Sequence, residues 1–91
     1  MNKTTAKKLN KLSDLIERCC VELEEAKNEL ETMQEQEQDR YDNMSERMQE
    51  SEKGCALYEL IEALEEAVSR LDDSVTELYD ISADIARATE E

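Results

Sequence analysis

Residues 42–54 of this chain read DNMSERMQESEKG and contain its only glycine, Gly54; the 91 residues include no proline. Because glycine and proline most often interrupt regular structure, we expect the chain to reverse direction in this segment. Asn43 or Ser45 can cap a new helical segment there. The stretch SEKG at 51–54 can either end a helix with a left-handed Gly54 or begin the next helix at Ser51. We expect a turn within 42–54 that holds a short helix over 45–50.

The segment before this turn carries a heptad pattern typical of one face of a coiled coil. Apolar side chains recur at alternating steps of three and four residues, at Leu9, Leu12, Ile16, Cys19, Leu23, Ala26, Leu30 and Met33. This spacing predicts a helix over about 6–41, capped by Thr4 or Thr5. The next apolar residue after Met33 is Tyr41, eight residues on, which predicts a local stutter in the pattern.

The segment after the turn predicts a second helix, over about 55–88. Its heptad positions are apolar except for Ser82, and they are Leu57, Ile61, Leu64, Val68, Leu71, Val75, Leu78, Ser82 and Ile85. Beside them lie Ala56, Leu60, Ala63, Ala67, Ile81, Ala83 and Ala86, so the apolar face is wider than a pair of helices needs.

Together these patterns predict one all-α domain over residues 1–91, folded as an antiparallel helical hairpin. Two helices alone bury a small core, so we expect the hairpin to form a homodimeric four-helix bundle. A coiled-coil dimer of long helices is the alternative. The expected oligomer interface comprises Leu57, Leu60, Ile61, Leu64, Val68, Leu71, Val75 and Leu78.

The charge is strongly negative, at −14, with 25 Asp and Glu against 11 Lys and Arg. Residues 1–20 are basic, at +3, whereas residues 21–52 and 54–91 each carry −9. Such a field favours a protein partner with a basic surface and disfavours direct binding to nucleic acid or to an anionic membrane.

No stretch is apolar enough to span a bilayer, and the N-terminus lacks the apolar region of a secretory signal. The cysteines Cys19, Cys20 and Cys55 are odd in number and have no CxxC spacing. We therefore expect free thiols and a cytoplasmic location, with a disulfide across a dimer as the alternative for the cysteines.

The residue content argues against an enzyme. The chain has no histidine, so Ser-His-Asp, Cys-His and Glu-x-x-His di-iron sites are excluded within it. It also has no glycine-rich phosphate loop. We expect no catalytic residue, no cofactor and no metal site.

The acidic residues form rows along both predicted helices. Carboxylates three or four residues apart lie on one helix face, about 5–6 Å from each other, a spacing of the same order as that of phosphates along a DNA strand. The rows comprise Glu22, Glu25, Glu29, Glu31, Glu35, Asp39, Asp42, Glu59, Glu62, Glu66, Asp73, Glu77, Asp80 and Asp84. They predict either a surface that mimics nucleic acid or a merely solvated face beside some other helical contact.

The segment YDNMSERMQESEKGCALYELIEALEEAV, residues 41–68, resembles small acidic helical proteins of Gram-positive bacteria and their phages or other mobile elements. Those proteins typically read YDNLPE, then QxSERGEAL, then repeats of IxxLEEA, and Ser45 stands here where they have proline. The resemblance carries over no functional residue. It implies a mobile-element context and favours an inhibitor of host defence.

These observations predict a non-catalytic inhibitor of a host nucleic-acid-binding defence protein, of the anti-CRISPR or anti-restriction type, that acts through its acidic rows. A structural or assembly coiled coil that works through its apolar faces is the alternative.

Overall fold

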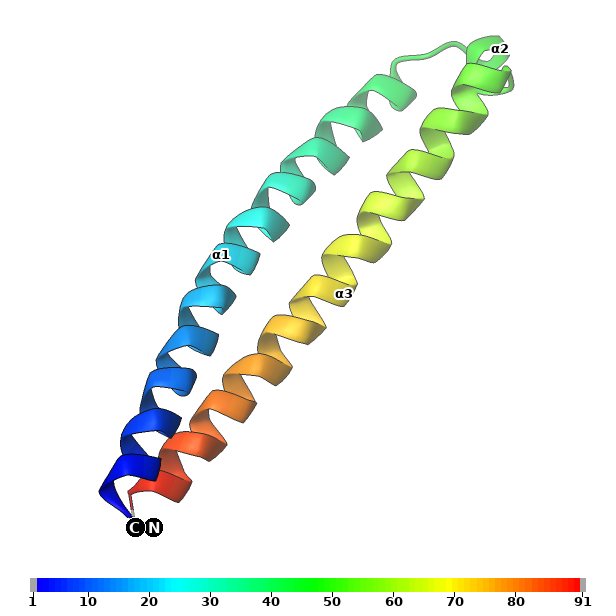
Figure 1. Ribbon diagram of the computed structural model, residues 1–91. Helices are drawn as coiled ribbons and strands as arrows, with labels where there is room; N and C mark the ends of the chain where they lie inside the picture. Colours follow the sequence, from blue (N-terminus) through cyan, green and yellow to red (C-terminus); the bar gives the residue numbers. More distant parts are fainter. Residues whose placement is uncertain (1, 91) are drawn as a thin grey trace. The chain divides into compact units, whose positions relative to one another are not determined.

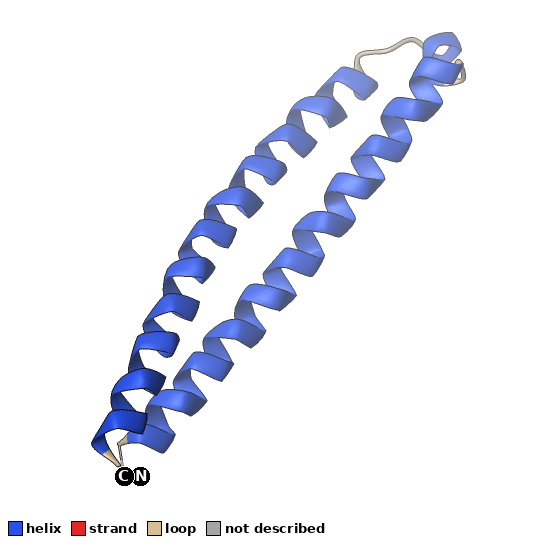
Figure 2. Ribbon diagram, in the orientation of Figure 1, coloured by secondary structure: helices blue, strands red, loops and turns tan. Residues whose placement is uncertain are grey.

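The computed structural model describes residues 2–90 and contains three helices, α1 (Lys3–Asp42), α2 (Glu46–Gln49) and α3 (Glu52–Thr89) (Figure 1). No strand occurs among the described residues (Figure 2), so the all-α prediction is confirmed. The chain divides into two compact units. Unit 1 comprises residues 2–25 and 71–90, and unit 2 comprises residues 26–70. The single domain over 1–91 and the homodimer stay predictions.

Each helix begins at a polar side chain that caps it. The N–H of Thr5 donates to Oδ1 of Asn2 at 2.8 Å, so α1 begins at Lys3 and not near residue 6 as predicted. The N–H of Met48 donates to the hydroxyl of Ser45 at 3.2 Å and starts α2. The N–H of Gly54 donates to the hydroxyl of Ser51 at 3.2 Å, so α3 begins at Glu52. The serines are therefore the caps in this segment.

Gly54 does not end a helix in the left-handed conformation, which was one of the two predicted roles of this segment. It lies in the first turn of α3, is buried, and has no positive φ. A Cβ atom there would lie 2.3 Å from the carbonyl oxygen of Met48 and 2.4 Å from that of Gln49. Glycine is needed because the backbone at the end of α2 approaches the start of α3 too closely for any side chain.

Unit 2 contains the predicted reversal. The parts of α1 and α3 in this unit run antiparallel, and the short α2 lies in the connection at their end, beside the start of α3 (Figure 1). The amide nitrogen Nε2 of Gln49 donates to the carbonyl oxygen of Tyr41 at 2.9 Å, which satisfies a carbonyl in the last turn of α1. The rings of Tyr41 and Tyr58 are 5.7 Å apart and tilted by 50°.

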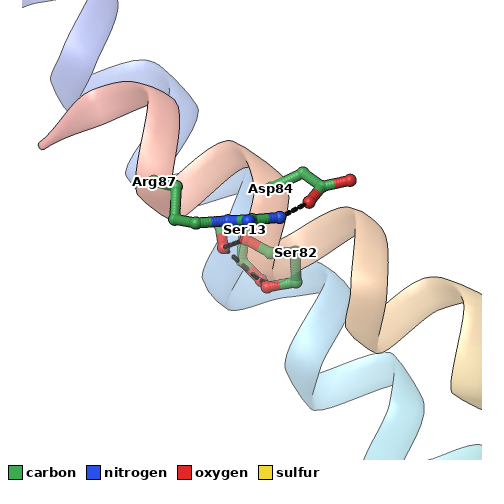
Figure 3. A network of polar contacts seen from close by, with 4 residues as sticks. All are labelled: Ser13, Ser82, Asp84 and Arg87. Carbon is green, nitrogen blue, oxygen red and sulfur yellow. Dashed lines mark hydrogen bonds and ion pairs between the residues drawn. The ribbon is translucent and has the colours of Figure 1, made fainter. Parts of the chain in front are cut away.

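Unit 1 joins the start of α1 to the end of α3 through buried polar atoms. The hydroxyls of Ser13 and Ser82 lie 2.7 Å apart, and Figure 3 shows them facing each other from the two helices. The hydroxyl of Ser82 also donates to Glu17 at 3.1 Å. The thiol of Cys20 faces the carbonyl oxygen of Val75 at 4.0 Å. Because residue 13 meets 82 and residue 20 meets 75, the helices are antiparallel here too.

The predicted heptad positions of α1 were half wrong. Leu9, Ile16, Leu23 and Leu30 face inward as predicted, but Leu12 and Met33 are about half exposed, and Cys19 and Ala26 are exposed. Inward positions between the leucines are instead Ser13, Cys20, Lys27 and Gln34. This line continues through Glu37 to Tyr41 and Met44 at steps of three and four, so the predicted stutter is absent from α1.

The two lines reach different residues at the end of the helix. At steps of seven residues, the line through Ser13 and Cys20 reaches Tyr41, which is half-buried, whereas the predicted line through Leu12 and Met33 reaches Arg40, which is exposed. On α3, by contrast, every predicted heptad position is buried or half-buried, Ser82 included. Among the described residues, no helix is sufficiently long and apolar to cross a membrane.

Candidate acidic binding surface

All fourteen carboxylates of the predicted rows are exposed. On unit 2, one row follows α1 through Glu31, Glu35, Asp39 and Asp42, and another follows α3 through Glu59, Glu62 and Glu66. Glu29 is also exposed on this part of α1. Within each helix the carboxylates stand one turn apart, about 5–6 Å between Cβ atoms. Unit 2 therefore presents acidic rows on both of its long helical segments.

Unit 1 presents the remaining carboxylates of the rows. Glu22 and Glu25 lie on α1, and Asp73, Glu77, Asp80 and Asp84 lie on α3. The guanidinium of Arg87 pairs with Asp84 within the last turns of α3 (Figure 3). The rows thus occur in both units, more densely on the α3 part of unit 1 than on its α1 part.

Exposed ion pairs along single helices involve two carboxylates of the rows, Glu66 and Asp84. Arg40 contacts Glu37 at 3.1 Å, and Arg70 contacts Glu66 at 3.9 Å, each along one helix. Exposed pairs of this kind stabilise by about 0.2–1 kcal/mol and break easily in salt. The carboxylates consequently stay available to a partner.

A half-exposed tyrosine accompanies the carboxylates in unit 2. The hydrogen bond from the Tyr58 hydroxyl to Glu62 raises the pKa of Tyr58, and the charge of Glu62, partial burial, Tyr41 and Glu65 act in the same direction. With 48% of its surface accessible, Tyr58 offers an aromatic ring beside an acidic row. Tyrosine is enriched at protein interfaces because its ring is apolar and its hydroxyl is polar.

Tyr79 has the matching position in unit 1. Burial raises its pKa most, followed by the charges of Glu24 and Cys20, a hydrogen bond to Glu24, and the charge of Glu17. The same side of unit 1 holds Cys20, whose pKa is raised by burial first and then by Glu24, Cys19 and Glu17. A tyrosine from α3 therefore stands among carboxylates of α1.

Four residues of this surface were not predicted from the sequence: Glu17, Glu24, Tyr58 and Tyr79. They lie directly beside the inward stripe of each helix, one residue after Ile16, Leu23, Leu57 and Leu78. Positions that follow a heptad leucine approach the facing helix, which is the signal that could have identified them. Ile16, Leu23, Leu57 and Leu78 were all predicted to face inward, so the signal was present, but it does not show which positions of the two helices meet.

The predicted oligomer interface lies mostly inside the chain. Leu57, Ile61, Leu64 and Val75 are buried, and Val68, Leu71 and Leu78 are half-buried. Leu60 alone of the eight is exposed, at 45%. Their role between copies of the chain stays a prediction, and Leu60 is the side chain most accessible to a second copy.

The cysteines are free thiols, with Cys20 buried and both Cys19 and Cys55 exposed. Within residues 2–90, no group of three or more Cys, Asp and Glu side chains is arranged to hold a metal ion. Comparisons of the chain with family models, curated proteins and solved structures found no match.

Proposed function

We propose that this protein is a non-catalytic inhibitor that binds a host nucleic-acid-binding defence protein, of the CRISPR or restriction type, through its acidic rows. The partner has a basic cleft built for a nucleic-acid backbone. The exposure of every carboxylate in the rows is the observation that supports this proposal best. The resemblance of residues 41–68 to small proteins of phages and mobile elements favours the same context.

The charge density of unit 2 is of the right order for such mimicry. Its α1 part, residues 26–42, is about 25 Å long at 1.5 Å per residue. Duplex DNA carries about 15 negative charges over that length. Unit 2 carries 13 Asp and Glu and 5 Lys and Arg, a net charge of −8. It therefore provides about half of the net charge of DNA, with a nearly equal number of anionic groups.

Binding and competition measurements test the proposal. Affinity capture from a Gram-positive host lysate identifies the partner, and the purified partner is then titrated with the protein at increasing salt. We expect fluorescent duplex DNA or guide RNA to be displaced from the partner. We also expect the affinity to fall steeply between 50 mM and 1 M salt, because the Debye length shrinks from roughly 14 Å to about 3 Å.

Two variants that each remove three negative charges distinguish the effect of the acidic rows from the effect of net charge. Glu59→Gln, Glu62→Gln and Glu66→Gln together remove one row and should weaken binding by about tenfold or more. The control replaces three exposed acids outside the rows: Asp14→Asn, Glu50→Gln and Glu90→Gln. Equal weakening by both variants, or binding that survives 1 M salt, contradicts mimicry.

A structural or assembly role is the second candidate, because large apolar side chains are exposed. They are Leu12, Leu15, Val21, Met33, Met48, Tyr58, Leu60, Tyr79 and Ile81. If the protein has that role, a variant with a neutralised acidic row still supports phage infection, whereas a variant with a charge on an apolar face does not.

A further inference from the structure

One side of unit 2 combines small and apolar side chains with very little negative charge. On α1 it comprises residues spaced by three and four, Ala26, Glu29, Met33, Gln36 and Arg40. On α3 it comprises residues with the same spacing, Lys53, Ala56, Leu60, Ala63, Ala67 and Arg70. We call these eleven positions the alanine-rich face. All are exposed except Ala67, which is half-exposed.

A groove places Arg40 of the α1 stripe on the same side of the unit as three residues of the α3 stripe. It has a volume of about 510 Å³, and Arg40, Lys53, Ala56 and Leu60 line it together with Met44, Met48 and Leu57. Met33 precedes Arg40 by seven residues and Ala67 follows Leu60 by seven, so both continue this side by two helical turns. Tyr41 and Tyr58 line a separate groove with Gln49, Cys55 and Glu59.

The charge of this face differs from that of the rest of unit 2. Of the 13 acids in residues 26–70, only Glu29 lies on it, against three of the five bases, Arg40, Lys53 and Arg70. The face therefore carries +2, and the remainder of the unit carries −10. Two copies of this face therefore repel each other less than two copies of the rest of unit 2 do, because +2 faces +2 here and −10 faces −10 elsewhere.

The packing within unit 2 leaves this face without a cover. The buried apolar side chains of the unit are Leu57, Ile61 and Leu64, while Leu60, Met33 and Met48 remain about half exposed. Alanines allow helices to approach closely, because the distance between helix axes depends on the side chains at the contact. Two such hairpins packed face to face would share a wider core, as in a four-helix bundle.

We propose that the protein forms a homodimer in which the alanine-rich face of unit 2 packs on the same face of a second copy. The face is about 25 Å long and two helices, about 20 Å, wide, so the pair buries about 1,000 Å² in total. This is at the low end for a specific interface, and we expect a dissociation constant of about 1–100 µM. The dimer does not depend on what the acidic rows bind.

Sedimentation equilibrium of the full chain from about 10 µM to 1 mM measures this association. At the highest concentration the mass should approach twice the 10.5 kDa of the chain. Leu60→Glu and, separately, Ala63→Glu should each weaken dimerisation by about tenfold or more, because each places a carboxylate in the interface. Val21→Glu is the matched control, since Val21 is 51% exposed and lies outside this face. Circular dichroism checks that each variant keeps its helical content.

Each outcome decides the proposal. Dimerisation that Leu60→Glu and Ala63→Glu weaken and Val21→Glu leaves within about threefold supports it. A chain that stays monomeric at 1 mM overturns it and leaves the face to another partner. An oligomer that the three variants weaken equally, or that only Val21→Glu weakens, also overturns it, because association then uses another surface.

Discussion

In unit 1 the contact between α1 and α3 includes buried hydroxyls. In unit 2 the buried side chains of α3 are leucine and isoleucine, and inward positions of α1 carry polar side chains. Ser13 and Ser82 are 5% and 1% exposed and bond to each other. In unit 2, Leu57, Ile61 and Leu64 are buried, while Gln34 and Glu37 occupy inward positions of α1. The same heptad spacing therefore supports two kinds of packing.

The difference shows where each unit gains its specificity. Apolar contacts tolerate small shifts, but a buried hydroxyl needs its partner at one position, so Ser13 and Ser82 fix the register of unit 1. Unit 2 is fixed at its reversal, where Gly54 touches the end of α2 and Gln49 bonds to Tyr41. Substitutions at these two places should therefore have different costs.

Gly54→Ala tests the reversal of unit 2 and should have the largest effect. Alanine normally stabilises a helix by about 1 kcal/mol relative to glycine. Here its Cβ would lie 2.3 Å from the Met48 carbonyl oxygen, and backbone cannot move aside as a side chain can. We expect the free energy of unfolding to fall by about 2–4 kcal/mol, measured by urea denaturation with circular dichroism.

Ser69→Ala is the control for this substitution, because Ser69 is exposed on α3 and gains helix propensity without a clash. If Gly54→Ala leaves the free energy of unfolding unchanged or raises it, the close approach of Gly54 to α2 does not fix the reversal. Unit 2 would then not owe its specificity to the reversal.

Ser82→Ala tests the register of unit 1 and should cost less. It removes the partner of the Ser13 hydroxyl, which keeps only the Ser82 carbonyl oxygen at 3.3 Å. We expect the free energy of unfolding to fall by about 1–2 kcal/mol. Ser13→Ala with Ser82→Ala should cost less than the sum of the single changes by about 0.5–1 kcal/mol, because neither hydroxyl is then stranded.

Ser74→Ala, at an exposed position of α3, controls for the change in helix propensity. If the double variant loses the sum of the two single losses in free energy of unfolding, to within about 0.3 kcal/mol, the two hydroxyls do not act as a pair. Unit 1 would then be held by its apolar side chains in the same way as unit 2.

Much of the fold was predictable because α3 and the caps carry strong local signals. The heptad positions of α3 are apolar almost throughout, and Ser45 and Ser51 cap helices in a segment with few alternatives. The inward stripe of α1 was not predictable from hydrophobicity, because Ser13, Lys27, Gln34 and Glu37 occupy it while Leu12 and Met33 are outside. Gly54 was recognised as a break, but its role depends on a contact with α2.

The candidate site divides in the same way. Exposure of the acidic rows follows from charge and helical spacing, which are local properties. The carboxylates around Tyr58 and Tyr79 differ: Glu62 is on the same helix as Tyr58, whereas Glu17 and Glu24 approach Tyr79 from α1. The second arrangement required the helix pairing, and so the sequence pattern did not reveal it.

The two tyrosines offer the smallest and most selective comparison of the units. The pKa of both is raised, so the folded state favours the neutral phenol: this stabilisation is complete below about pH 10 and is lost as the pH rises through the folded pKa. Ultraviolet titration of tyrosinate follows each residue in Tyr→Phe backgrounds, and the chain has no tryptophan to interfere.

The causes of the two shifts predict different responses. A hydrogen bond to Glu62 contributes most to Tyr58, so Glu62→Gln should lower the pKa of Tyr58 and leave that of Tyr79 unchanged. Burial contributes most to Tyr79, so Glu24→Gln should lower the pKa of Tyr79 without returning it to the ordinary value. Equal responses of the two tyrosines would mean that one long-range field of the acidic chain, and not the local structure of each unit, sets both values.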